Sequence, residues 1–214
     1  RDLTNDKGNI VAVIGDGSLS GGLAMEALNN AGDFKGNLII LVNDNQMSIA
    51  ENHGGLYRNL AELRATNGQA ENNFFKTFGL DYKYLANGND IESLIHLFEE
   101  VKDIDHPIVL HIHTEKGRGY QPALENKEAF HWHMPFDLET GQSKVIDSGK
   151  SYSSVMLDYM DKKVSEGLPL VAINAAIPGI FGLKQFAAKY PDRYIDAGIA
   201  EQFTITFGGA MAAT

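Results

Sequence analysis

Residues Asn9-Ile-Val-Ala-Val-Ile-Gly-Asp-Gly-Ser18 indicate the fold class, because a continuous apolar run ends there in a glycine-rich turn. A run of this kind is typical of a parallel strand that is covered on both faces. Apolar residues at helical spacing follow over residues 19–31, Gly32 can cap that helix, and residues 37–42 form a second apolar run. Strand, helix and strand in this order predict a right-handed βαβ unit.

The same alternation continues along the chain. We predict a helix within residues 56–64, a strand over 81–85, an amphipathic helix over 90–102 and a strand over 107–113. The helix over 90–102 carries an apolar stripe that we expect to be buried, which comprises Ile91, Leu94, Ile95 and Phe98. This pattern predicts the α/β fold class, with open, mostly parallel sheets flanked by helices.

The periodicity disappears between residues 125 and 149, a polar stretch with one proline and two glycines. We therefore predict a first domain over residues 1–137, a linker over 138–150 and the start of a second domain over 151–214. In the second domain, Ser151 can cap a helix that reaches about residue 166, and a helix over 183–189 follows.

We interpret the chain as an internal fragment of a longer enzyme. It starts at Arg1 without an initiator methionine, close to a predicted strand, and it stops in a small-residue stretch over 208–214 that has no helix-stop signal. Both predicted domains are therefore expected to be incomplete, the first lacking its N-terminal part and the second its C-terminal part.

Composition and charge exclude several classes of protein. Among 214 residues, 18 Lys and Arg stand against 28 Asp and Glu, and the net charge of -10 argues against nucleic acid or an anionic membrane as partner. The absence of cysteine excludes disulfides, thiolate zinc sites and cysteine nucleophiles. No apolar run reaches about 18 residues and no signal peptide opens the chain, so we expect a cytoplasmic protein.

Two polar loops follow the first two predicted strands. Gly15-Asp-Gly-Ser18 ends the first strand, and Asn43-Asp-Asn-Gln-Met-Ser-Ile49 ends the second. Ligands of open α/β sheets bind outside the carboxyl ends of the strands, where a helix N-terminus offers N–H groups to an anion. Oxygen atoms of Asp16, of the Asn45 side chain and of a backbone carbonyl near Met47 suit Mg²⁺ that is shared with a diphosphate. Either loop alone is also a common structural turn.

These loops carry a resemblance to a known family. Gly-Asp-Gly with Asn45 placed 29 positions after Asp16 resembles the thiamine diphosphate signature of the transketolase superfamily. The sequence around both loops, together with residues 114–120, 130–131, 135–137, 191–194 and 199–202, resembles 1-deoxy-D-xylulose-5-phosphate synthases in particular. The resemblance covers nearly the whole chain and implies the thiamine diphosphate-binding fold.

The resemblance also implies roles for individual residues. Mg²⁺ would be bound by Asp16, Asn45 and the Met47 carbonyl, and thiamine diphosphate would be contacted by Gly17, Ser18 and Tyr120. Glu201 would hydrogen-bond the aminopyrimidine ring of the cofactor, and we expect it to be sheltered from water with a raised pKa. His131 would face the reacting carbonyl and shuttle protons. Without the resemblance, both are ordinary loop side chains.

The implied reaction is the condensation of pyruvate with glyceraldehyde 3-phosphate, with decarboxylation, to 1-deoxy-D-xylulose 5-phosphate. This product is a precursor of isoprenoids, thiamine and pyridoxal. The resemblance implies a homodimer, and the motifs leave open whether the active site lies within one chain or between subunits. The family's upstream cofactor histidines and downstream sugar-phosphate arginines lie outside this sequence, so the isolated fragment is expected to be inactive.

The sequence departs from the family at several positions. The segment between Ile49 and Phe78 is shorter than usual, Asn89 stands where the family has His, and Phe203 replaces the His that follows Ala-Glu-Gln. The Mg²⁺ and Glu201 positions are intact. Two alternatives stay open: another transketolase-like thiamine diphosphate transferase with a different acceptor, and a non-catalytic α/β module that binds a nucleotide or a partner protein.

Overall fold

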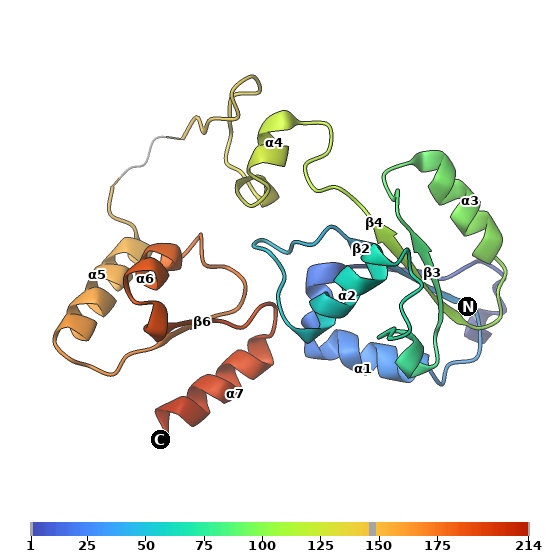
Figure 1. Cartoon of the computed structure of the whole chain (residues 1–214), viewed down its shortest axis with the longest axis horizontal. Coiled ribbons are helices and arrows are strands. Elements are labelled where there is room, and N and C mark those ends of the chain that lie inside the picture. The colour runs from blue at the N-terminus through green and yellow to red at the C-terminus, as the bar shows by residue number, and fades with distance from the viewer. Residues whose placement is uncertain (1, 146–148, 214) are drawn as a thin grey trace. The chain divides into compact units, whose positions relative to one another are not determined.

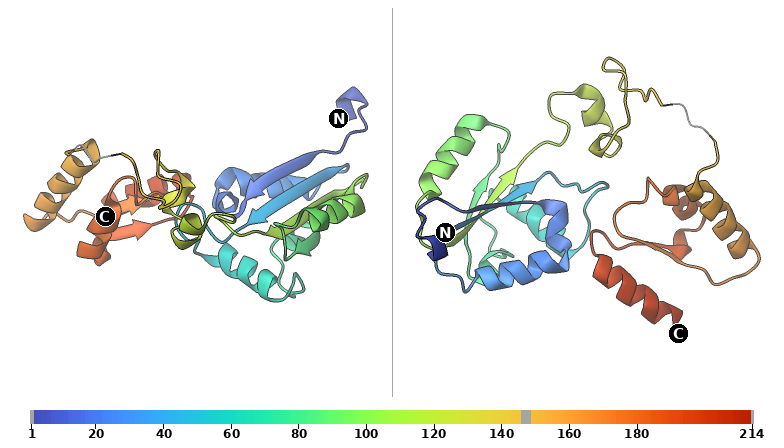
Figure 2. Two further views of the ribbon diagram at one scale, coloured as in Figure 1. Left: turned by 90° about the horizontal axis from the view of Figure 1, so that it is seen from above. Right: turned by 180° about the vertical axis from the view of Figure 1, so that it is seen from behind.

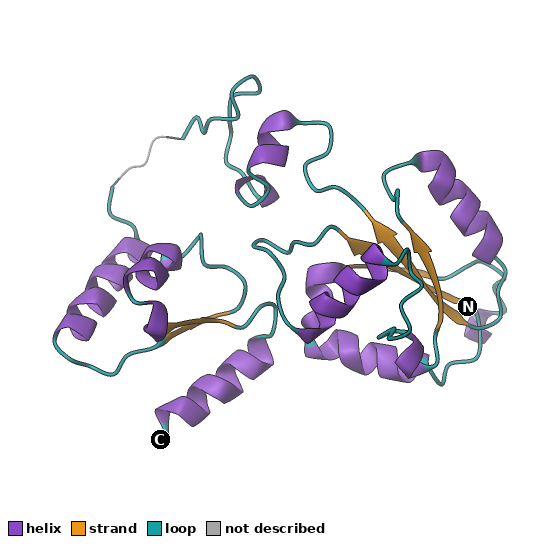
Figure 3. Ribbon diagram, viewed as in Figure 1, coloured by secondary structure: helices purple, strands orange, loops and turns teal. Residues whose placement is uncertain are grey.

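A computed structural model describes residues 2–145 and 149–213 of the chain (Figure 1). The chain divides into two compact units, Arg1–Lys116 and Gly117–Thr214. This division lies earlier than the boundary predicted at residue 137, and residues 146–148 of the predicted linker lie outside the described residues. The predicted domain limits therefore stay a prediction. Helices and strands alternate in both units, which confirms the α/β class (Figure 3).

Within the described residues, four parallel strands form the sheet of the first unit. These are β1 Val11–Gly15, β2 Leu38–Asp44, β3 Asp81–Leu85 and β4 Pro107–His113, in the order β1-β2-β4-β3 (Figure 2). Gly15 at the end of β1 pairs with Asn43 of β2. Because all the strands run in one direction, the loops that follow β1 and β2 leave the same edge of the sheet side by side.

Helices cover the two faces of this sheet. The helices α1 Gly22–Ala31 and α2 Gly55–Ala65 pack on one face, and α3 Ile91–Val101 packs on the other. Side chains alternate along β2, so Ile40 and Val42 join the first core while Ile39 joins the second. Short 3-10 turns lie at Asp2–Thr4, Asp16–Ser20 and Lys76–Phe78.

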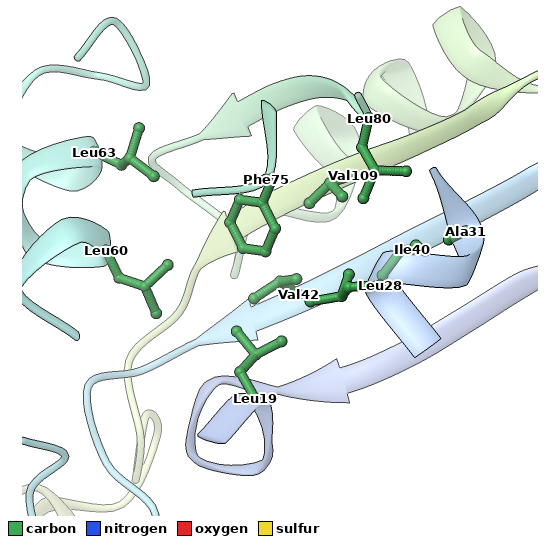
Figure 4. Close-up of a cluster of buried hydrophobic side chains, with 10 residues drawn as sticks. All are labelled: Leu19, Leu28, Ala31, Ile40, Val42, Leu60, Leu63, Phe75, Leu80 and Val109. Carbon is green, nitrogen blue, oxygen red and sulfur yellow. The ribbon is translucent and has the colours of Figure 1, made fainter. Parts of the chain in front are cut away.

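Phe75 lies within the core on the face of α1 and α2. Figure 4 shows its ring among Val42 and Val109 of the sheet and Leu60 of α2. Phe75 is 0% exposed, and it stacks on Tyr82 with the ring centroids 5.7 Å apart. This packing ties α2 to the carboxyl half of the sheet, where the two polar loops begin.

Two burial predictions are wrong. Val11 and Val13 of β1 are 43% and 68% exposed, and Ile91 and Ile95 of the predicted stripe are 65% and 48% exposed. The reason is topological, because β1 is an edge strand and, in the described part of the chain, α3 packs on the neighbouring strands. Val11, Ile91 and Ile95 instead line an open apolar groove of about 460 Å³.

The second unit is built on a short parallel sheet of β5 Ala172–Asn174 and β6 Tyr194–Asp196. Its helices and 3-10 turns are α4 Gln121–Glu125, η4 Ala129–His131, α5 Tyr152–Ser165, α6 Leu183–Lys189, η5 Pro191–Arg193 and α7 Glu201–Ala212. The predicted cap of α5 is confirmed, since the Ser151 hydroxyl accepts the Ser154 N–H at 3.1 Å. None of the helices in the described residues combines the length and apolar character needed to cross a membrane.

The burial pattern of α1 yields a matched test of this core. Leu28 is 4% exposed and Leu23, on the same helix, is 77% exposed. We expect Leu28→Ala to lower the free energy of unfolding by about 2–5 kcal/mol, because it removes buried methyl groups and leaves a cavity. Leu23→Ala should change it by less than about 0.5 kcal/mol. Urea unfolding of both variants checks this, and equal losses would contradict the placement of α1.

Candidate functional site

The loops that follow β1 and β2 are in contact. Gly17 lies so close to the second loop that a Cβ atom placed on it would be 2.6 Å from the Cβ atom of Ser48. The Asn52 amide, further along the second loop, donates a hydrogen bond to Oδ2 of Asp16 at 2.9 Å. The structure therefore brings together Asp16 and the segment that contains Asn45 and Met47, as the parallel strand order requires.

Asp16 is a buried carboxyl group at the end of β1. The residue is 2% exposed, and its Oδ1 accepts the N–H of Gly17 at 2.9 Å. Burial raises the pKa of Asp16 from 3.8 to about 7, and the neighbouring Asp44 carboxylate adds to the rise. A buried carboxyl group beside a second carboxylate is an arrangement that a cation stabilises.

Asp44 is the second carboxyl group, and it is already compensated. Its Oδ2 accepts a hydrogen bond from His111 at 2.8 Å and another from Arg64 of α2. Burial opposes the ionisation of Asp44, but His111 and the Arg64 charge outweigh it and lower its pKa to about 2. Arg64 thus neutralises Asp44, while the hydrogen bonds described for Asp16 come from the Gly17 N–H and the Asn52 amide, which carry no charge.

The second loop is held in a tight turn. Oδ1 of Asn45 accepts the Met47 N–H at 3.2 Å, and Gln46 has a φ of 69°, in the left-handed region. Oδ1 of Asp44 accepts the Gln46 N–H at 3.1 Å. Lys116 donates to the Ser48 carbonyl, so this lysine supports the loop. These contacts fix the backbone of the segment that contains Asn45 and Met47.

Three residues that contribute to this arrangement were not identified from the sequence. Asn52 donates to Asp16, Arg64 pairs with Asp44, and the Tyr57 hydroxyl hydrogen-bonds the Gly17 carbonyl at 3.0 Å. Their partners lie 36, 20 and 40 residues away in the chain, so no local pattern connects them. Their only sequence signal is that polar and aromatic side chains follow the Asn-Asp-Asn loop closely.

The structure places the other predicted site residues as follows. Ser18 lies in the exposed part of the first loop. In the second unit, the Tyr120 hydroxyl donates to the Leu138 carbonyl at 3.0 Å, and His131 is exposed in a 3-10 turn. Glu201 is the first residue of α7 and is exposed, so the expected shelter from water is absent in the structure described. These three residues belong to a different unit from Asp16, so their predicted roles in one site stay predictions.

Two of the departures noted in the sequence have local explanations. Oδ1 of Asn89 accepts the Glu115 N–H at 2.7 Å and so supports the chain after β4. Phe203 is 55% exposed and stacks on Phe207 one turn further along α7, with the centroids 5.3 Å apart. Each side chain therefore has a structural partner within its own unit.

Comparison with known proteins decides the family of the chain. Residues 1–72 and 68–114 match the family model described as 1-deoxy-D-xylulose-5-phosphate synthase, which is more than half of the sequence. The chain belongs to the 1-deoxy-D-xylulose-5-phosphate synthase family. The family predicted from the two loops is therefore confirmed, and the matched segments include both of them.

Individual relatives agree with this assignment. The chain is 40% identical over 253 residues to "1-deoxy-D-xylulose-5-phosphate synthase 1" of Geobacter metallireducens, an alignment that covers 100% of this chain and 40% of the relative. It is 38% identical over 220 residues to the synthase of Listeria monocytogenes, with 99% of this chain and 36% of the relative covered. The chain spans about two fifths of the length of the curated relatives it matches.

The relatives differ in the length of the aligned region. The Geobacter metallireducens alignment runs over 253 residues and that of Listeria monocytogenes over 220, against 214 residues here. Some synthases therefore carry more extra residues in this region than others.

Among solved structures, a transketolase variant of Pichia stipitis has 19% sequence identity and a TM-score of 0.41, and the match covers 86% of this chain and 26% of that chain.

The contact between the loops yields a matched glycine test. A Cβ atom on Gly17 would collide with Ser48, whereas one on Gly15 would meet nothing within 4 Å. Gly17→Ala must push the second loop away from Asp16, so we expect it to weaken Mg²⁺ binding about tenfold or more. Gly15→Ala should leave the affinity within about threefold. Calorimetric titration with Mg²⁺ measures both, and equal affinities would contradict a site between these loops.

The raised pKa of Asp16 predicts how cation binding depends on pH. Its pKa of about 7 in the folded chain lies above the reference value of 3.8, so without metal the free energy of unfolding falls as the pH rises from about 4 to 7. Mg²⁺ needs the ionised carboxylate and competes with the proton. Its apparent affinity should therefore rise about tenfold per pH unit up to pH 7 and level off above. Titrations at several pH values measure this, and a flat profile below pH 7 would contradict it.

Proposed function

We propose that this chain is part of a thiamine diphosphate- and Mg²⁺-dependent 1-deoxy-D-xylulose-5-phosphate synthase. The enzyme would condense pyruvate with glyceraldehyde 3-phosphate, releasing CO₂ and forming 1-deoxy-D-xylulose 5-phosphate. The observation that carries this proposal is the contact of the Gly-Asp-Gly loop with the Asn-Asp-Asn loop at the ends of β1 and β2. Family membership identifies the reaction class that such a site would serve.

The chemistry of the donor set fits a magnesium ion. Asp16 supplies a carboxylate, Asn45 an amide oxygen and Met47 a backbone carbonyl, and these are the hard oxygen ligands that Mg²⁺ prefers. Mg²⁺ takes few protein ligands and completes its shell with water and phosphate oxygens. The raised pKa of Asp16 supports the fit, because a bound cation would relieve the repulsion between Asp16 and Asp44.

The chain's own residues would bind and orient the cofactor. The Asp16 carboxylate would hold the cation, and the missing side chain of Gly17 would let the second loop pack close to Asp16. Glu201 would hydrogen-bond the aminopyrimidine from the first position of α7. Bound thiamine diphosphate would supply the carbon nucleophile and the electron sink that decarboxylation requires.

Other residues would act on the substrates and the cofactor ring. His131 would donate and accept protons at the reacting carbonyl, a task suited to an imidazole near neutral pH. Ser18 and Tyr120 would contact the cofactor. We further propose a cytoplasmic homodimer, as the family resemblance implies, whose product supplies isoprenoid, thiamine and pyridoxal synthesis.

The activity of the full-length protein tests the proposed function. Release of CO₂ from pyruvate should require both Mg²⁺ and thiamine diphosphate, and glyceraldehyde 3-phosphate should be consumed in equal amount. Glu201→Gln should lower the rate about 10²–10⁴-fold, because it removes a proton-transferring carboxyl group. Absence of pyruvate-dependent CO₂ release from the native protein would rule out the synthase reaction.

A matched variant controls for the loss of a surface charge. Glu139 is an exposed carboxylate of the same unit, in a loop outside the proposed catalytic groups. Glu139→Gln makes the same chemical change and should leave the rate within about twofold. Equal losses in the two variants would show that Glu201 has no special part in the reaction.

A further inference from the structure

Two hydrogen bonds connect Tyr82, His111 and Asp44 in series next to the second loop. The Tyr82 hydroxyl of β3 is 2.8 Å from Nδ1 of His111 of β4, and Nε2 of His111 is 2.8 Å from Oδ2 of Asp44. His111 and Asp44 are both 0% exposed. Because an ionised carboxylate only accepts, Nε2 of His111 donates to Asp44, and Nδ1 is left to accept the Tyr82 O–H. The imidazole is therefore held at both nitrogens.

Asp44 links these two hydrogen bonds to the backbone of the second loop. Its Oδ1 accepts the N–H of Gln46 at 3.1 Å, and its own carbonyl accepts the N–H of Thr114 at 2.9 Å. Gln46 has a φ of 69°, a conformation that is unfavourable for a residue with a side chain and persists only when neighbouring groups hold it. The carboxylate of Asp44 is such a group.

The turn at Gln46 determines where its two neighbours point. Asn45 precedes it and Met47 follows it, and these residues supply two of the three proposed cation ligands. A change in the turn at Gln46 would therefore move both oxygen atoms relative to Asp16. The groups that fix the turn control the geometry of the site without touching the ion.

We infer that His111 is a positioning residue of this site. Through its hydrogen bond to Asp44 it holds the left-handed turn at Gln46, and so it aims the Asn45 amide and the Met47 carbonyl at the cation. The inference rests on the proposed function, since it takes these two groups as ligands. It goes beyond that function, because His111 of β4 is not one of the proposed ligands, and its described hydrogen bonds go to Tyr82 and Asp44 and to none of the proposed ligands.

Three variants separate positioning from simple destabilisation of the sheet. His111→Leu keeps an apolar side chain but removes the donor to Asp44. His111→Gln can restore it, because the amide nitrogen of glutamine can take the place of Nε2. Leu110→Ala is the matched control: Leu110 is 0% exposed and lies next to His111, but it packs in the core on the opposite face of the sheet.

The readout is amide hydrogen exchange of Gln46 and Met47, measured by NMR without metal or cofactor, together with Mg²⁺ affinity by calorimetry. We expect His111→Leu to speed the exchange at least tenfold and to weaken Mg²⁺ binding about tenfold or more. His111→Gln and Leu110→Ala should each stay within about threefold of the native protein in both measurements. Unchanged exchange in His111→Leu, or equal acceleration in Leu110→Ala, would overturn the inference.

A further variant covers the case in which His111→Leu does not fold. Tyr82→Phe keeps the ring and removes the O–H donor to Nδ1 of His111. Tyr84→Phe is the control, because it removes a hydroxyl from the same strand that takes no part in the hydrogen bonds from Tyr82 to Asp44. Faster exchange at Gln46 only in Tyr82→Phe supports the inference, and equal rates in the two variants overturn it. If the native protein bound no Mg²⁺, the proposed function would fail, and hydrogen exchange alone would decide the positioning role.

Discussion

Two carboxyl groups buried side by side are the constraint on which the site depends. Asp16 and Asp44 follow or end adjacent parallel strands, and burial makes their mutual repulsion strong. One arginine and one histidine stabilise Asp44 as the carboxylate, while Asp16 has a pKa raised to about 7. The site is therefore prepared for one more positive charge, and a divalent cation at Asp16 would supply it.

The strand order and register of the sheet bring Asp16 and Asp44 close together. Parallel strands carry their following loops to one edge of the sheet, and the register of Gly15 with Asn43 sets the two loops at the same height. The packing of Phe75 and Leu60 brings α2 close to the end of β2, which allows Arg64 to reach Asp44. Stability and site geometry thus share the same contacts, so a core substitution in α2 also affects the loops.

Local sequence patterns predicted the elements better than the contacts between them. The strands over 81–85 and 107–113 and the helix over 183–189 match β3, β4 and α6, because their apolar periods and end signals are local. The adjacency of the two loops also followed from strand order. The exposure of Ile91 could not be predicted from local patterns, because it depends on the place of β1 at the edge of the sheet and on the packing of α3 against the neighbouring strands.

The same limit applies to the site. Asp16, Asn45 and Met47 are predicted as ligands from their places in the two loops, whereas the contacts of Asn52, Arg64 and His111 join residues that are distant in sequence. From the sequence, His111 is expected to be an ordinary core residue of a strand. Only the structure shows that its two ring nitrogens connect Tyr82 to Asp44. Groups that support a site from behind have no local signature.

Anomalous diffraction from crystals of the full-length protein grown with Mn²⁺ in place of Mg²⁺ locates the proposed ion. We expect one strong anomalous peak in each site, about 2.1 Å from the Asp16 carboxylate, the Asn45 amide oxygen and the Met47 carbonyl. A crystal grown with saturating Mn²⁺ that shows no peak at Asp16, or shows the ion bound by other residues, would contradict this assignment of the ligands.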